Sequence, residues 1–166
     1  MMGYFIMAVL AGVAFLASLV CHVLGWLRIA PPGGQWVFAL HVGIFVFWIP
    51  LVILANRSMP KGAKNNMDYL LAALPKWVRR ATGVLFFYAI LHFFLFLYLT
   101  TRYPRNGVPF YLEIRGFSGH WMAFYGVAAV GFAALGRLAR QRADPGVVLK
   151  VRQKATCARC HHLFPA

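Results

Sequence analysis

Four histidines are the residues of this sequence whose type and placement most favour chemistry. They fall one each into four long apolar runs, as His22, His41, His92 and His120. An imidazole binds metals through a ring nitrogen and is costly to place inside a bilayer, so a histidine there is a functional hypothesis by default. Two imidazoles at matching depth on neighbouring helices could hold a haem b iron between them.

Residue counting from the end of each run gives the expected depth of the histidines. A helix rises about 1.5 Å per residue, which places His41 and His92 roughly 7 and 12 Å below one membrane interface. His22 and His120 fall within a turn of that interface. We therefore expect His41 and His92 to form the first haem-ligand pair, and His22 and His120 the second. The alternative is that each histidine is structural, because a neutral imidazole also forms hydrogen bonds between helices.

A second motif lies near the C-terminus and reads Cys157-Ala158-Arg159-Cys160-His161-His162. Thiolates at this spacing bind one face of a tetrahedral zinc ion, so Cys157, Cys160 and His162 form a candidate zinc site. His161, water or a partner chain would supply the fourth ligand. The same motif is typical of c-type haem attachment and of thiol–disulfide exchange, both on the outer side of the membrane. A reduced pair without a ligand is the remaining alternative.

The elements that must position the histidines are runs without charged side chains. Hydrophobic residues make up 61% of the chain, above the approximately 45–50% of soluble domains. Since about 20 apolar residues cross the hydrocarbon core, the runs predict four transmembrane helices, near Tyr4–Leu24, Trp36–Ala55, Ala81–Thr100 and Ser118–Gly136. We expect an all-α integral membrane protein, with a four-helix bundle in residues 1–136 and a basic tail in 137–166.

The first run is long for a signal peptide, whose apolar core has roughly 7–15 residues. It also lacks Lys and Arg ahead of the apolar stretch. We expect a transmembrane helix here, and we expect Cys21 to be a buried structural cysteine.

The positive charge is confined to particular connections. The chain has seventeen Lys and Arg residues but only three acidic residues, for a net charge of +14. Most of the basic residues lie in residues 57–80 and after residue 136. Basic connections stay on the cytoplasmic side, so we expect both termini inside the cytoplasmic membrane, with anionic lipid at the inner surface. Basic blocks between charge-free runs do not indicate nucleic-acid binding.

The connection before the third helix predicts a short helix of its own. Asn66-Met67-Asp68 is typical of a helix start, and Leu70, Leu71, Leu74, Trp77 and Val78 follow at helical spacing. Pro75 would interrupt this segment. The segment is expected to be either an amphipathic helix that lies in the inner interface or the first turns of the third transmembrane helix.

Small residues favour close helix contacts in the first and last helices. They are Ala8, Gly12, Ala14 and Ser18 in the first, and Gly126, Ala128, Ala129, Gly131, Ala133, Ala134 and Gly136 in the last. These faces pack either inside the bundle or against another subunit. The aromatic outer connection in residues 101–117 is a further candidate contact surface.

Three acids leave little for general acid–base catalysis. We expect a non-catalytic membrane subunit that packs in a larger membrane complex, for which a complex of electron transfer is a candidate. The alternative is a haem-carrying electron-transfer subunit. Helix number and histidine placement broadly resemble small membrane cytochromes b, and this resemblance implies haem inside the bundle and electron exchange with quinone. A small oligomeric channel is a third option.

Overall fold

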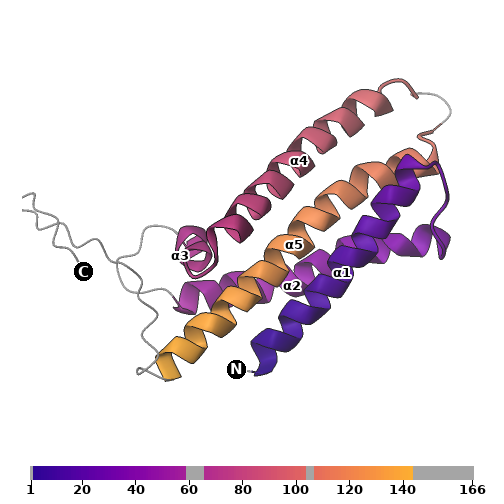
Figure 1. Cartoon of the computed structure of the whole chain (residues 1–166). Coiled ribbons are helices and arrows are strands. Elements are labelled where there is room, and N and C mark those ends of the chain that lie inside the picture. The colour runs from indigo at the N-terminus through magenta and orange to yellow at the C-terminus, as the bar shows by residue number, and fades with distance from the viewer. Residues whose placement is uncertain (1, 59–65, 104–106, 144–166) are drawn as a thin grey trace, which may run out of the picture.

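The computed structural model describes residues 2–58, 66–103 and 107–143, and every regular element within them is a helix. Four segments are long and apolar enough to cross a membrane, as predicted. The long helices are α1 (Met2–Trp26), α2 (Ala39–Ser58), α4 (Lys76–Thr100) and α5 (Phe110–Ala143) (Figure 1). The 3₁₀ helix η1 (Gly34–Phe38) leads into α2, and α3 (Asn66–Ala72) is short. The candidate zinc ligands Cys157, Cys160 and His162 lie outside the described residues.

The longest helix, α5, lies at the centre of the arrangement. α1, α2 and α4 each pack mainly against α5 and only slightly against one another (Figure 1). Half of the most apolar stretch of α5 is buried, compared with 17% for α1 and 11% for α2 and α4. In the described part of the chain, α1, α2 and α4 therefore pack around α5.

Glycines allow the close contacts with α5. A Cβ atom at Gly131 would lie 2.8 Å from Leu51 of α2, and one at Gly126 would lie 2.8 Å from Leu85 of α4. On the opposite side, a Cβ atom at Gly25 of α1 would lie 3.0 Å from the backbone nitrogen of Arg115. These small residues pack inside the protein, where they bring helix backbones together.

Two helices begin earlier than the sequence pattern predicts. α5 starts at Phe110 rather than near Ser118, and α4 starts at Lys76 rather than near Ala81. The sequence pattern places charged residues such as Glu113 in the connections between helices. Charged residues are tolerated at a helix end. An acid in the first turn interacts favourably with the helix dipole, and long basic side chains extend to the headgroup level. The outer connection predicted for residues 101–117 ends before Phe110.

The short helix predicted before the third span is present as α3. It ends at Ala72, before Pro75, and Leu70 packs its side chain into the core beside Leu51 and Leu135. The Arg142 guanidinium of α5 donates to the Ser58 carbonyl at 2.6 Å and to the Tyr69 hydroxyl at 3.5 Å. The end of α5 is thereby tied to both α2 and α3.

The prediction that Cys21 is buried is confirmed, since it is a buried free thiol. At the start of η1, Gly33 and Gly34 have φ angles of +95° and +55°, in the left-handed region that favours glycine.

Candidate functional site

The four histidines gather on one half of the molecule. The ring centroids of His22 and His92 lie 4.8 Å apart, and those of His41 and His120 lie 6.2 Å apart. The ring of Phe93, which follows His92 in the chain, lies 5.5 Å from the ring of His120 and connects the two pairs. The structure thus forms one histidine cluster from all four helices, but it pairs the rings differently from the expected pairs His41–His92 and His22–His120.

His120 lies further along its helix than the sequence pattern places it. Because α5 begins at Phe110, His120 lies roughly 15 Å along the helix at about 1.5 Å per residue. At this position its ring lies beside that of His41, with ring centroids 6.2 Å apart. His92 instead turns toward α1, where it meets His22.

His22 is held by three hydrogen bonds from three helices. The Trp26 indole N–H donates to His22 Nε2 at 3.0 Å, and the Tyr88 hydroxyl lies 2.6 Å from the same nitrogen. An indole nitrogen only donates, so Nε2 must be the unprotonated acceptor. Nδ1 then carries the proton and donates to the Ser118 hydroxyl at 2.9 Å. His22 is a neutral, fully bonded imidazole in this arrangement.

His41 has the opposite tautomer by the same reasoning. The Trp121 indole N–H donates to His41 Nδ1 at 3.1 Å, so the proton of the neutral ring lies on Nε2. Phe117 packs edge-on against His41, with centroids 5.6 Å apart, and it also lies 5.7 Å from the ring of His120.

These bonds predict distinct tautomers that can be observed directly. In protein labelled with ¹⁵N-histidine and placed in lipid, we expect Nδ1–H for His22 and Nε2–H for His41. Trp121→Phe should remove the constraint on His41 alone, because it deletes only that donor. Nitrogen chemical shifts from solid-state NMR report the tautomer. The same tautomer at both residues would contradict these contacts.

His92 lacks the hydrogen bonds that hold His22 and His41. It is 5% exposed, and neither ring nitrogen has a hydrogen-bond partner among the described residues. Aromatic rings surround it, with Trp26 at 6.0 Å and Tyr88 at 5.5 Å between centroids. A Cβ atom at Gly119 would lie 3.0 Å from His92 Nδ1. A buried polar atom left without a partner costs about 1–3 kcal/mol.

The contacts leave little room for haem between the paired rings. A haem ligand needs an unprotonated nitrogen facing the iron, yet the acceptor nitrogens of His22 and His41 are already bonded to tryptophans. His22 and His92 are in direct ring contact, and Phe117 lies against both His41 and His120. Haem binding would require these side chains to rearrange.

Within the described ranges, no three His, Cys, Asp or Glu side chains come together to hold a metal ion. The cluster is instead a hydrogen-bonded and aromatic assembly. The Arg115 guanidinium extends it by lying 4.3 Å from the centroid of the Trp26 ring, an arrangement that favours a cation on the ring face.

The hydrogen-bond and ring partners of the histidines were not predicted from the sequence. Two of them could have been found, because Trp26 follows His22 by four residues and Tyr88 precedes His92 by four, and such pairs share a helix face. Ser118 and Trp121 come from another helix. Sequence spacing carries no signal for such contacts.

No family model, curated protein or solved structure matches this chain. Its function is therefore argued from its own residues.

Proposed function

We propose that this protein is a non-catalytic membrane subunit that packs in a larger membrane complex through the groove between α1 and α4. The observation that supports this is an open, small-residue surface at that position. A cavity of about 380 Å³ lies between the two helices over α5, and its lining includes Gly12, Ala81, Gly126 and Ala129. A Cβ atom at Gly12 would meet nothing within 4 Å.

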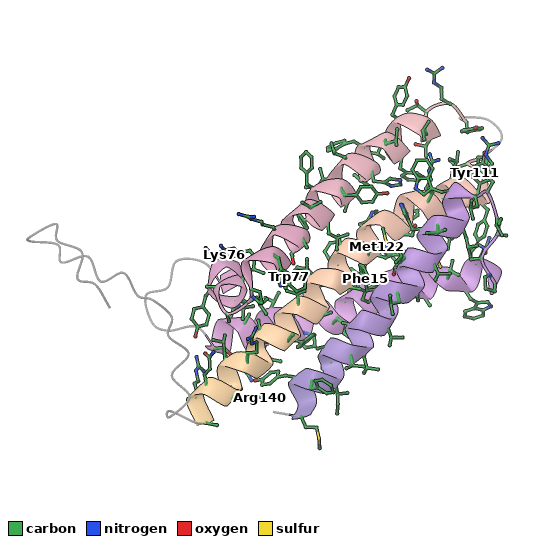
Figure 2. All side chains as sticks on the ribbon, in the orientation of Figure 1. Phe15, Lys76, Trp77, Tyr111, Met122 and Arg140 are labelled. Atoms are coloured by element: carbon green, nitrogen blue, oxygen red, sulfur yellow. The ribbon has the colours of Figure 1, made fainter. Side chains whose placement is uncertain are left out.

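The groove suits a transmembrane helix of a partner. Helices in lipid associate by close packing rather than by a hydrophobic drive, and small residues let a second backbone approach. Phe15 of α1 and Trp77 of α4 lie on its two sides (Figure 2). Since α4 packs extensively only on α5, a partner in this groove would also support α4.

We further propose that the end carrying α3 is cytoplasmic. Lys76 and Arg140 lie at that end, opposite Tyr111 (Figure 2). The described basic residues divide unequally, with Arg57, Lys76, Arg79, Arg80, Arg137, Arg140 and Arg142 toward one end and Arg28, Arg102 and Arg115 toward the other. Basic residues are retained inside. Both ends of the chain would then face the cytoplasm, where the basic surface attracts anionic lipid.

Cysteine labelling tests this orientation. In a variant whose three native cysteines are replaced by serine, we expect Arg102→Cys to react with a membrane-impermeant maleimide in intact cells. Arg79→Cys should react only after the membrane is opened, because its side chain would lie inside. The reverse pattern would overturn the orientation.

Site-specific photo-cross-linking tests the groove. A photoreactive phenylalanine analogue at Trp77, which lines the groove and is 71% exposed, should give one discrete adduct with another membrane protein. The same analogue at Leu16, which is 58% exposed on α1 and does not line the groove, is the matched control and should give none.

A Gly12→Leu variant would fill the groove and should reduce the Trp77 adduct about 5- to 150-fold, since one extra buried side chain there costs about 1–3 kcal/mol. An adduct unaffected by Gly12→Leu, or an equal adduct from Leu16, would exclude docking in this groove.

The second candidate function is a haem-carrying electron-transfer subunit. His92 favours it, because a buried imidazole with two unpartnered nitrogens is a potential iron ligand. The accessory-subunit proposal needs no rearrangement of the histidine cluster, whereas haem does. Visible spectra of wild type and His92→Leu separate the two functions.

A further inference from the structure

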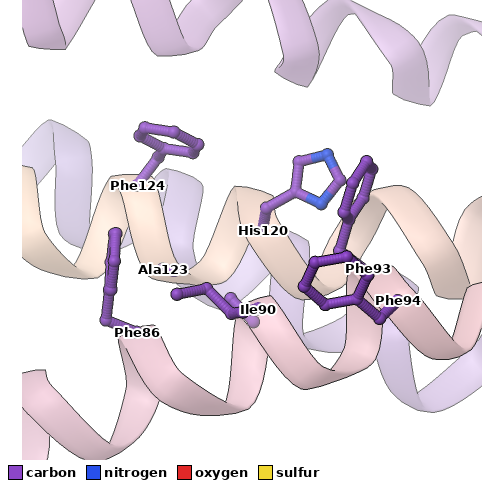
Figure 3. A pocket seen from close by; sticks show the side chains of 8 residues that line it. Phe86, Ile90, Phe93, Phe94, His120, Ala123 and Phe124 are labelled. Atoms are coloured by element: carbon purple, nitrogen blue, oxygen red, sulfur yellow. The ribbon is translucent and has the colours of Figure 1, made fainter.

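A second groove lies where α2, α3, α4 and α5 meet. Its cavity of about 310 Å³ is lined by Trp48, Leu71, Arg79, Thr82, Gly83, Phe86 and Val127. Phe86 also borders the neighbouring apolar cavity between α4 and α5 (Figure 3). Arg79 lies near the start of α4, and Phe86 follows about two turns, or roughly 11 Å, further along the helix. The lining therefore carries a charged side chain near one membrane interface and apolar side chains at greater depth.

The polar groups deeper in this groove are already satisfied within the protein. The Thr82 hydroxyl donates to the Val78 carbonyl at 2.9 Å, and the Trp48 indole N–H donates to the Phe124 carbonyl at 3.1 Å. Because these donors are engaged, a ligand that lies deep in the groove gains nothing from polar groups of its own and would pay to bury them. The deep part of the groove therefore suits an apolar chain.

Arg79 lacks the partners that the arginines at the opposite end of the molecule have. The guanidinium groups of Arg28, Arg102 and Arg115 each lie over an aromatic ring, at 4.3 to 5.7 Å from its centroid. Arg79 is exposed, and within the described part of the chain its side chain has neither a hydrogen bond nor an ion pair. Its charge is available to a ligand.

Positive charge is concentrated at the start of α4. Lys76, Arg79 and Arg80 lie there together, and the first turn contains no acidic residue. Lys76 lies at the end of the molecule that carries α3 (Figure 2). Three cations near a helix N-terminus repel one another and the positive end of the helix dipole. An anion at the mouth of the groove would offset both effects.

From these contacts we infer that the groove binds one anionic phospholipid, with its phosphate at Arg79 and an acyl chain between Trp48 and Val127. A guanidinium can pair with two phosphate oxygens at once, and basic pockets between transmembrane helices are known sites for anionic headgroups. The inference assigns a defined site, beyond the general attraction of a basic surface for anionic lipid. It does not depend on a partner in the groove between α1 and α4.

Lipid titration followed by native mass spectrometry tests the site. Full-length protein in detergent micelles would be titrated with phosphatidylglycerol or with phosphatidylcholine of the same acyl chains. We expect wild type to retain one phosphatidylglycerol, with an affinity about fivefold higher than for phosphatidylcholine. Equal retention of the two lipids by wild type would overturn the inference, and this comparison requires no variant.

Two charge variants locate the headgroup. Arg79→Gln should bind the two lipids alike, because it removes the charge proposed to hold the phosphate. Arg140→Gln is the matched control, since it removes one positive charge at the same end of the molecule, outside the groove (Figure 2). It should keep the preference for phosphatidylglycerol. Equal loss of the preference in both variants would indicate diffuse surface charge and overturn the inference.

A leucine at Gly83 locates the acyl chain. A Cβ atom at Gly83 would meet nothing within 4 Å, so Gly83→Leu should fill the groove while the protein keeps its helicity by circular dichroism. We expect it to weaken retention of both lipids about 5- to 150-fold, with Gly12→Leu in the other groove retaining them as wild type does. Unchanged retention in a folded Gly83→Leu variant would show that no chain occupies this groove.

Discussion

Replacing Gly25 by leucine should lower the free energy of unfolding by about 1–3 kcal/mol, the usual cost of overpacking a tight contact. A Cβ atom at this position would lie 3.0 Å from the backbone nitrogen and 3.1 Å from the Cα atom of Arg115. A side-chain neighbour could rotate away, but a helix backbone cannot, so α1 must move away from α5. Unfolding in mixed micelles, followed by circular dichroism, measures the change.

Gly12→Leu is the matched control on the same helix. Nothing lies within 4 Å of its Cβ position, so we expect the stability of the isolated chain to stay within about 0.5 kcal/mol of wild type. The same variant should weaken docking of the partner proposed for the groove between α1 and α4. Equal destabilisation by both leucines would mean that the close approach of α1 to α5 does not exist.

The second large effect is expected from His22→Leu, and it should differ sharply from that of His92→Leu. Loss of His22 leaves the Ser118 and Tyr88 hydroxyls and the Trp26 indole without their partner. Trp26 and Tyr88 are 50% and 37% exposed, so each bond lost there costs about 0.6 kcal/mol, the average for hydrogen bonds in membrane proteins. Ser118 is buried, and an unsatisfied buried group costs about 1–3 kcal/mol. We expect a total loss of about 2–4 kcal/mol, measured in the same unfolding assay.

His92→Leu should be neutral or stabilising by up to about 1 kcal/mol, because it removes two buried nitrogens that have no protein partner. A loss of more than about 2 kcal/mol would show that His92 binds something beyond the described chain. Visible spectra of oxidised and dithionite-reduced protein would then identify it. A b-type haem signal that disappears in His92→Leu would favour the electron-transfer function over the accessory subunit.

The positions of the four spans could be predicted because charge-free length is itself the physical requirement for crossing a bilayer. The ends of the spans could not be predicted. The sequence pattern places Glu113, Arg79 and Arg80 in connections, whereas the structure places them inside helices. Charged side chains at helix ends extend into the headgroup region, so the helix continues where the apolar run stops.

The gathering of the four histidines on one half of the molecule could also be predicted, but not the pairing of their rings. Residue counting gives depth, whereas the direction in which a ring points depends on how each helix is rotated about its axis. Gly119, which lets His92 approach α5, and Trp121, which sets the tautomer of His41, fix those directions. Both contacts are made between helices. They follow from packing and are not encoded in the spacing of residues along one segment.

The central place of α5 has a consequence for biosynthesis. A ribosome delivers helices in chain order, and α5 is the last of the four spans, yet α1, α2 and α4 each pack mainly on it. The first three spans must therefore remain in the membrane with few contacts to one another until α5 is inserted. A membrane chaperone or insertase that shields polar side chains such as His22 would matter most during that interval.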